Sequence, residues 1–291
     1  MNSRGNKLFL FKNFLAYLRV KDWLHVLGLT LLGTAFNSFF SIFSYKAFSA
    51  LAVSALYLAH GFSLNNYFDA DIDKRINKQY LPPGGKKLLF FSYSLFIVNC
   101  FISYRICAPV FYLVLAGSLL ASLYSAPPFR MKKSAFPNII LNSAGFAIIF
   151  LIGFAAVRGR ITRASAMTAA LFALLFIPLQ IVHQIAHAEA DRAENILTLY
   201  NRYGYAKTLA ILKASLSLLV LWSLLIGALY RDYIAVFYLT LPLSLAIFYF
   251  LKKLRGAGNA LQKSATELRD ILKKICLLYG TALILAFRAA G

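Results

Sequence analysis

Charged residues and cysteines are scarce in this sequence, and their scarcity excludes several classes of protein. Charged residues make up 14% of the 291 residues, whereas 60% are hydrophobic. A soluble domain of this size carries far more charge, so we do not expect a soluble protein. The three cysteines, Cys100, Cys107 and Cys276, lie in apolar segments and lack the paired spacing of a metal site or a disulfide framework. We interpret them as buried packing thiols.

The first 21 residues lack the small-residue cleavage pattern that ends a signal peptide. They combine aromatic residues with five basic ones: Arg4, Lys7, Lys12, Arg19 and Lys21. This composition is typical of a segment that lies at the membrane surface. We therefore expect a basic interfacial leader over residues 1–21 and a transmembrane domain over residues 22–291.

Long apolar stretches fill the rest of the chain. Two connections between them are very short, Ala108–Pro109 and Arg231, which indicates helical hairpins, because unpaired backbone cannot lie in lipid. The sequence thus predicts an all-α polytopic membrane protein, with about nine transmembrane helices in a bundle around a central cavity. The expected spans are 22–44, 47–68, 88–107, 109–126, 136–157, 165–187, 205–230, 232–251 and 270–288.

The net charge of +21 is distributed unevenly along the chain. With nine spans, the leader and the loops after the second, fourth, sixth and eighth spans share one side of the membrane, and they carry most of the basic residues. Basic loops favour the cytoplasmic side. The charge therefore predicts orientation and contact with anionic lipid, and we expect no nucleic-acid partner. A bacterial or archaeal cytoplasmic membrane is the simplest location.

A polar cluster ends the second span. Asn65, Asp69 and Asp73 recur every four residues, so they lie on one face of a helix. Carboxylates at the end of a span repel one another unless a cation or water reaches them. Mg²⁺ suits this arrangement, because one or two carboxylates hold it while phosphate oxygens and water complete its octahedron. A solvated helix end is the alternative interpretation.

A second polar cluster ends the sixth span, where His183, His187 and Asp191 recur at the same spacing. Eight helical residues rise about 12 Å, so His183 and Asp191 cannot share one ion in a regular helix. His187 and Asp191 form the best-placed pair for a second ion, with Glu189 as an outlying ligand if the helix unwinds. A pair of hydrogen-bonded packing histidines is the alternative.

A basic loop follows the fourth span. Pro127 and Pro128 stop the helix, and Arg130, Lys132 and Lys133 follow. Arginine binds phosphate through two parallel hydrogen bonds and lysine supplies a movable charge, so this loop is suited to a diphosphate. In isolation, a membrane-orienting anchor is an equally good interpretation. The two polar clusters share one membrane face with the loop, and this combination favours a site.

These segments resemble the UbiA superfamily of intramembrane prenyltransferases. The family pattern Asn-Asp-x-x-Asp-x-x-x-Asp is similar to Asn65-Asn66 with Asp69 and Asp73, and Asp-Lys-Arg-Ile-Asn at 73–77 continues the likeness. The family's Tyr-Ser-x-x-x-x-Arg-x-Lys pattern is matched by a second set of residues: Tyr124, Arg130 and Lys132. Its third pattern, Asp-x-x-x-Asp, aligns its later aspartate with Asp191.

Three departures from the family pattern bear on the metal site. Asn66 and His187 each replace an aspartate, and the Arg-Pro-rich stretch after the first motif is shortened to 78–84 without its arginine, for which Lys86 and Lys87 are candidates. Magnesium prefers oxygen ligands. The altered third motif therefore leaves three possibilities open: one Mg²⁺ alone, a softer ion such as Mn²⁺, or His187 as a phosphate contact or base.

The resemblance implies that residues 22–291 form a prenyltransferase-like domain, which transfers an isoprenyl chain from an isoprenyl diphosphate to an acceptor in the membrane. It implies catalytic roles for Asp69, Asp73, Asp191 and His187, which with Asn65 are also the expected metal ligands. It implies diphosphate binding by Asn65, Tyr124, Arg130 and Lys132. The acceptor stays open among an aromatic ring, a glycerophosphate backbone, a sugar phosphate and a porphyrin-type ring.

Two other functions stay open on the sequence, a cation-coupled membrane transporter and a non-catalytic protein that binds prenyl lipid. Transporters place polar residues near the middle of the bilayer, whereas here they gather at one surface. The retained Asp69, Asp73 and Asp191 favour catalysis over binding alone.

Overall fold

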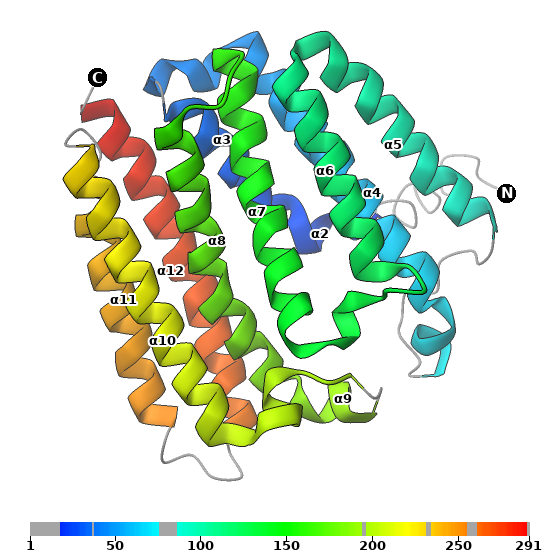
Figure 1. Cartoon of the computed structure of the whole chain (residues 1–291), viewed down its shortest axis with the longest axis vertical. Coiled ribbons are helices and arrows are strands. Elements are labelled where there is room, and N and C mark those ends of the chain that lie inside the picture. The colour runs from blue at the N-terminus through cyan, green and yellow to red at the C-terminus, as the bar shows by residue number, and fades with distance from the viewer. Residues whose placement is uncertain are drawn as a thin grey trace, which may run out of the picture.

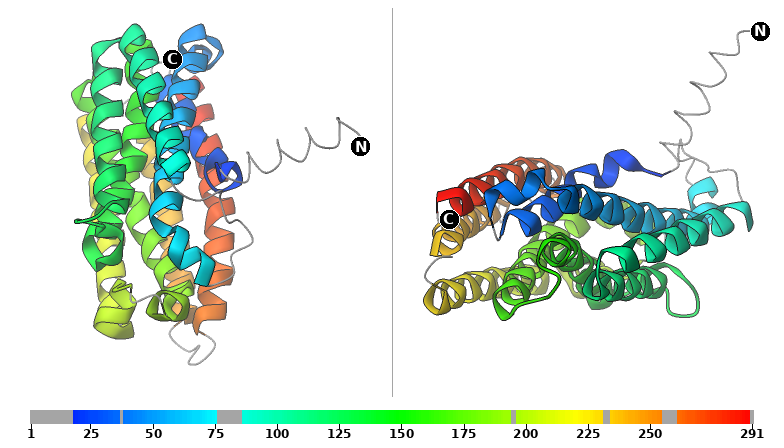
Figure 2. Two further views of the ribbon diagram at one scale, coloured as in Figure 1. Left: turned by 90° about the vertical axis from the view of Figure 1, so that its right-hand side faces the viewer. Right: turned by 90° about the horizontal axis from the view of Figure 1, so that it is seen from above.

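The computed structural model describes residues 18–36, 38–75, 86–193, 196–230, 234–254 and 261–289, and within these ranges its regular structure is helical. The long helices run side by side along the long axis of the molecule (Figure 1; Figure 2, left). Short elements come first: α2 (Val20–Trp23), η1 (Leu24–Leu27), α3 (Gly28–Ala35) and η2 (Phe39–Phe43). The later elements are α4 (Tyr45–Arg75), α5 (Lys86–Ile106), α6 (Ala108–Ser125), η3 (Met131–Lys133), α7 (Ala135–Arg158), α8 (Arg163–Ala186), α9 (Ala188–Ala193), α10 (Leu199–Leu229), α11 (Ile234–Leu254) and α12 (Leu261–Ala289).

Six helices in the described part of the chain are long and apolar enough to cross a bilayer: α4, α5, α6, α7, α8 and α10. They confirm the prediction of an all-α, polytopic membrane protein. α11 contributes a shorter apolar stretch, Thr240–Tyr249. The expected total of nine spans stays a prediction.

The first predicted span, 22–44, is not a single helix. Its α-helical part, α3, has eight residues and so rises about 12 Å, with 3-10 turns before and after it. Ser44 is extended, and its hydroxyl oxygen accepts a hydrogen bond from the Ala47 N–H at 3.2 Å. This bond caps the start of α4 and separates it from the preceding turn. A hydropathy profile does not detect a side chain that caps a helix by accepting a backbone hydrogen bond.

α3 crosses α7 at a contact between two glycines. A Cβ atom on Gly33 would lie 2.1 Å from the Phe150 carbonyl oxygen, and one on Gly153 would lie 2.1 Å from the Thr30 carbonyl oxygen. Only glycine lets the two backbones approach so closely. The short α3 is thereby held against the long α7 inside the bundle.

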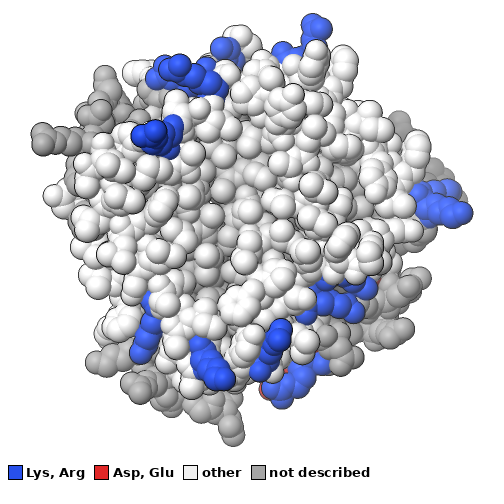
Figure 3. All heavy atoms as spheres, in the orientation of Figure 1, with Lys and Arg blue, Asp and Glu red and all other residues white. Residues whose placement is uncertain are grey.

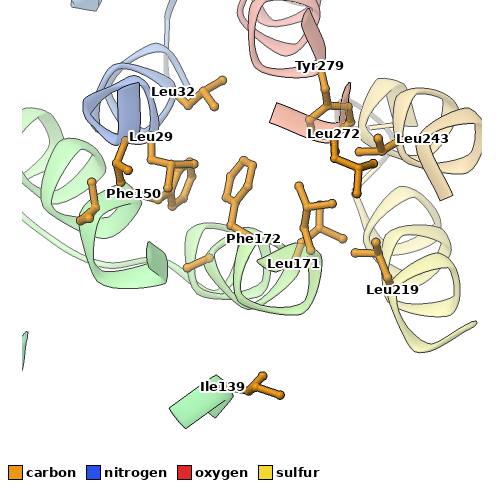
Figure 4. Packing of buried hydrophobic residues seen from close by; sticks show 14 of the residues in the cluster. Leu29, Leu32, Ile139, Phe150, Leu171, Phe172, Leu219, Leu243, Leu272 and Tyr279 are labelled. Atoms are coloured by element: carbon orange, nitrogen blue, oxygen red, sulfur yellow. The ribbon is translucent and has the colours of Figure 1, made fainter. Parts of the chain in front are cut away.

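Aromatic rings fill the space beside this crossing. The Phe150 and Phe172 rings lie 5.0 Å apart between α7 and α8, and Leu29 and Leu32 of α3 belong to the same buried cluster (Figure 4). Phe36 contacts Phe150 edge to face at 5.6 Å. These contacts place the apolar core at the centre of the helix bundle and join its N-terminal segment to its middle helices.

The outer surface is apolar where a membrane would contact it. On the face shown in Figure 3, lysine and arginine side chains lie toward the upper and lower ends and at the right edge, and the central part carries none. Large apolar side chains project outward from the long helices; Phe101 of α5, for example, is 69% exposed. In water such a surface would aggregate, whereas in hydrocarbon it costs nothing. The structure is therefore that of an integral, multi-pass membrane protein.

Candidate active site

The three segments singled out in the sequence lie at one end of the bundle. In Figure 1 the C-terminal end of α4, the connection between α6 and α7 and the short α9 are all at the lower end of the molecule. A backbone hydrogen bond joins two of these segments, from the Leu197 N–H after α9 to the Lys133 carbonyl oxygen at 3.0 Å. The basic loop and the third motif are thus fixed to each other.

Asp69 of α4 is held by two cations from the basic loop. Its Oδ1 atom accepts a hydrogen bond from Arg130 Nη2 at 2.8 Å and a second, short one from Lys132 Nζ. The Lys132 ammonium also donates to the Asn65 Oδ1 atom at 2.9 Å. Asn65 and Asp69 stand one turn apart on α4, so the loop bridges the face that the sequence spacing predicts.

The shape of the loop explains how both cations reach α4. α6 ends at Ser125, and Arg130 adopts a left-handed conformation (φ 38°, ψ 50°), which is rare for a residue with a Cβ. The Asn138 side-chain amide donates to the Lys132 carbonyl oxygen at 2.7 Å and holds the turn to α7. Strain of this kind persists only where surrounding contacts enforce it, and it is concentrated at functional sites.

Arg130 retains hydrogen-bonding capacity. Its Nη2 atom donates to Asp69 and to the Phe68 carbonyl oxygen at 2.8 Å, whereas its Nε atom is buried and has no partner among the described residues. A buried donor without a partner is costly. The orphan Nε is suited to an anion that enters the site.

Tyr124, at the end of α6, links the first motif to the third. Its hydroxyl oxygen accepts a hydrogen bond from the Asn142 side-chain amide at 3.3 Å. The charges of Asp69, Asp191 and Arg19 all act on this hydroxyl. Tyr124 is therefore within electrostatic reach of one carboxylate from the first motif and one from the third.

Arg19 is a neighbour of the site that the sequence pattern did not reveal. It belongs to the end of the predicted leader, whose residues 1–17 lie outside the described part of the chain. Its guanidinium lies 5.3 Å from the Phe62 ring centroid of α4 and pairs with Asp22 at 2.6 Å. The leader prediction treated Arg19 as a surface charge, and no periodicity distinguishes it from the other basic residues there.

The third motif does not continue one regular helix. α8 ends at Ala186, His187 has non-helical angles (φ −107°, ψ 11°) and α9 then begins at Ala188. The His183 and His187 rings lie 4.5 Å apart, and His187 Nε2 is 2.7 Å from Arg269 Nη1 of α12. Arg269 was not predicted, because it lies in another helix, 82 residues further along the chain.

Polar contacts fix this break. The Gln184 side-chain oxygen accepts from the Leu199 N–H at 3.1 Å, and the Asn201 side-chain amide donates to the Ala188 carbonyl oxygen at 3.0 Å. Thr198 caps α10 by accepting from the Asn201 N–H. α9 is therefore attached to both of its neighbouring helices, which fixes the region around Asp191.

The donor atoms fit a hard divalent cation. The Asn65 amide oxygen and the Asp69 carboxylate are oxygens of the kind that Mg²⁺ prefers. The third predicted ligand, Asp73, lies on α4, but its side chain is outside the described residues. Among those that are described, no three His, Cys, Asp or Glu side chains cluster closely enough to hold an ion by themselves. A metal ion held by Asn65 and Asp69 would need further ligands, which the predicted Asp73, phosphate or water could supply.

A separate cavity of about 230 Å³ lies between α4, α5 and α6. His60 on its wall is buried, and the ring Nδ1 is 2.9 Å from the Ser92 carbonyl oxygen. Because a carbonyl can only accept, this bond places the His60 proton on Nδ1. The cavity is lined by His60, Tyr93, Phe96, Leu115, Ser118, Leu119 and Ser122. It is mostly apolar and lies apart from the carboxylates of the three motifs.

Comparison with solved structures places this fold among known membrane enzymes. A digeranylgeranylglyceryl phosphate synthase superposes with a TM-score of 0.77 at 22% identity, over 96% of this chain and 99% of that one. A UbiA homologue from Archaeoglobus fulgidus, solved with DMAPP and Mg²⁺, superposes with a TM-score of 0.70 at 17% identity, over 94% of this chain and 99% of that one. These likenesses concern the fold.

Sequence comparison extends the likeness to the family. The chloroplastic chlorophyll synthases of Arabidopsis thaliana and of Oryza sativa subsp. japonica are 28% and 26% identical over 155 residues, 49% of this chain. The matched region spans 40% and 41% of those two relatives, less than half of their length. The model of the UbiA prenyltransferase family matches residues 23–268, which is most of the sequence and contains all three motifs. The chain therefore belongs to the UbiA prenyltransferase family.

Proposed function

We propose that this protein transfers an isoprenyl chain from an isoprenyl diphosphate to an acceptor in the membrane. The observation that carries the proposal is the bridging of Asp69 by Arg130 and Lys132, beside an orphan Arg130 donor. Arg130 and Lys132 both bind the same carboxylate oxygen of Asp69, and a diphosphate that enters can replace this carboxylate as their partner. The cations then bind phosphate oxygens, and the carboxylate is released for a metal ion.

Asn65, Asp69 and Asp73 would hold Mg²⁺ on the diphosphate, with Asp191 facing the same region from α9. Bound there, Mg²⁺ neutralises diphosphate charge and so weakens the bond between the allylic carbon and the diphosphate oxygen. Mg²⁺ is the preferred ion in this proposal because the Archaeoglobus fulgidus homologue was solved with Mg²⁺ and with either DMAPP or GPP. Mn²⁺ is the expected substitute ion.

The protein's own groups then have distinct tasks. When the allylic carbon–oxygen bond breaks, its electron pair stays on the diphosphate, where Arg130 and Lys132 stabilise the added charge. Tyr124, whose hydroxyl accepts a hydrogen bond from Asn142, would supply an aromatic ring that stabilises the allylic carbocation. The acceptor forms the new bond to the allylic carbon and loses a proton.

The membrane orientation follows from charge. The end of the molecule that holds the motifs carries Arg130, Lys132 and Lys133, and the exposed Arg192 and Arg202 lie on α9 and α10. We propose that this end faces the cytoplasm, as the loop charges predict. A water-soluble diphosphate head then reaches the site from the cytoplasm, and the prenyl tail stays in the bilayer.

Release of pyrophosphate tests the proposal. The purified full-length protein is incubated with geranyl, geranylgeranyl and longer diphosphates, with Mg²⁺ and pooled membrane lipids as acceptors, beside Asp69→Asn. Mg²⁺-dependent release in the wild type and its loss in the variant support the enzyme. Binding of the diphosphate without release, under every metal and acceptor, would instead indicate the non-catalytic prenyl-lipid-binding protein.

A further inference from the structure

Arg269 reaches the third motif from α12, which packs against α8. Its Nη1 atom lies 2.7 Å from His187 Nε2, and its Nε atom lies 3.1 Å from the exposed carboxylate of Asp270. The Arg269 side chain is 21% exposed, against 56% for Asp270. Arg269 is therefore a partly buried cation whose firmest contact is with an imidazole in place of a carboxylate.

The chemistry of arginine fixes the direction of this contact. A guanidinium has only N–H donors, so His187 Nε2 must be the acceptor. In the neutral ring the proton then lies on Nδ1. One ring nitrogen is occupied by Arg269 and the other carries hydrogen, so neither keeps a lone pair for a metal ion. This arrangement disagrees with a metal-binding role for His187.

The position of the pair connects it to the diphosphate region. The Asp191 N–H donates to the His187 carbonyl oxygen at 2.9 Å, so the two residues stand one turn apart across the break between α8 and α9. Asp191 acts with Asp69 on the Tyr124 hydroxyl. The contact between Arg269 and His187 therefore lies one helical turn from Asp191.

Arg269 also has an unused donor group. Its contacts with described residues engage Nη1 and Nε, whereas Nη2 makes none with them. A guanidinium with one terminal amino group anchored and the other available is the arrangement that binds a phosphate oxygen. Arg130 of the basic loop likewise keeps a donor without a partner among the described residues, its Nε.

We propose that Arg269 is a diphosphate-binding residue and that His187 is the positioning residue that orients it. The inference rests on the proposed function and deepens it. The positive charge at the third motif then comes from an arginine fixed on α12, and the carboxylate that His187 replaces is not needed as a metal ligand. A purely structural clasp between α8 and α12 is the alternative.

Two binding measurements on the full-length protein test this inference. The first is the affinity for geranyl S-thiolodiphosphate, an unreactive analogue, with Mg²⁺ present. We expect Arg269→Gln to weaken binding about ten-fold or more, because a charge-assisted hydrogen bond is lost. The affinity of Arg269→Lys for the analogue should lie between those of the wild type and Arg269→Gln. Lys274→Gln removes the same charge from an exposed position on α12 and should bind the analogue as tightly as the wild type does.

The second measurement counts Mn²⁺ ions bound with the analogue, by electron paramagnetic resonance. His187→Ala should bind the wild-type number of Mn²⁺ ions and should bind the analogue more weakly. The double variant His187→Ala with Arg269→Gln should bind the analogue no more weakly than Arg269→Gln alone. Loss of a Mn²⁺ ion in His187→Ala would overturn the inference. So would wild-type analogue affinity in Arg269→Gln, whatever its thermal stability, since that is the result a structural clasp predicts.

Asp69→Asn separates this inference from the proposed function. If Asp69→Asn abolishes Mg²⁺-dependent analogue binding while Arg269→Gln has no effect, the inference fails and the proposed function stands. If Asp69→Asn binds the analogue as tightly as the wild type, the proposed function fails, and with it the inference that rests on it.

Discussion

Arg130 donates to Asp69 across the gap between the α6–α7 connection and α4, at 2.8 Å, and the same nitrogen also donates to the Phe68 carbonyl oxygen. The guanidinium therefore touches both the side chain and the backbone of α4. A lysine ammonium could donate both bonds from its single nitrogen, but it lacks the planar fork and the Nε donor that arginine keeps for an entering phosphate. The geometry of Arg130, and not only its charge, sets the distance between the basic loop and the first motif.

Replacement of Arg130 by lysine should separate charge from geometry. We expect Arg130→Lys to lower kcat/KM about 100-fold for an isoprenyl diphosphate, because one charge-assisted hydrogen bond to a phosphate oxygen is lost, which contributes about 1.5–3 kcal/mol. The measurement is steady-state pyrophosphate release with Mg²⁺. A kcat/KM within a factor of three of the wild type would show that positive charge alone suffices.

Lys132 and Lys133 form a matched pair for mutation. Lys132 is 8% exposed and contacts Asn65 and Asp69, whereas Lys133 is partly exposed and makes no such contact. We expect Lys132→Gln to raise KM for the diphosphate and to reduce kcat/KM at least ten-fold. Lys133→Gln should change both by less than three-fold. Equal losses in the two variants would mean that the loop acts only through its net charge.

The glycine contact between α3 and α7 should control stability. Gly33→Ala places a Cβ atom 2.1 Å from a backbone oxygen of Phe150, so the helices must separate. We expect a loss of about 1–3 kcal/mol in the free energy of unfolding. The measurement is a denaturant titration of the detergent-solubilised protein. Gly28→Ala is the control, because nothing lies within 4 Å of its added Cβ. Similar losses in both variants would refute the role of the close crossing.

Labelling of single cysteines tests the proposed orientation. In a chain with Cys100, Cys107 and Cys276 replaced by serine, Arg202→Cys introduces an exposed thiol near the motif end and Arg160→Cys one in the connection between α7 and α8. A membrane-impermeant maleimide should modify Arg202→Cys only from the cytoplasmic side and Arg160→Cys only from the other side. The reverse pattern would place the motifs outside the cytoplasm.

The helices and the first motif were predictable because they depend on local patterns. Long apolar runs fix the membrane helices, and the spacing of Asn65 and Asp69 fixes their shared face. Pro127 and Pro128 mark the end of α6, and the cations that follow lie beside Asp69 in the structure. The roles of these residues in metal and diphosphate binding stay predictions.

Tertiary contacts account for what the sequence did not reveal. Spacing alone suggested that His183, His187 and Asp191 follow one helix, but Gln184 and Asn201 draw the chain toward α10 and break the helix at His187. The approach of Arg269 depends on how α12 packs against α8, which no local pattern encodes. The start of α4 at Tyr45 depends on the Ser44 cap.

Transfer of a labelled prenyl group shows directly whether this protein joins an isoprenyl chain to an acceptor. Geranylgeranyl diphosphate with a radioactive prenyl chain is incubated with Mg²⁺, the protein in nanodiscs and a panel of candidate acceptors, and the products are extracted and counted. Our account predicts that label enters an acceptor in molar equality with the pyrophosphate released, and that Asp69→Asn forms neither product. Binding of the diphosphate with no label transferred to any acceptor, in a protein that is folded and saturated with Mg²⁺, would contradict it.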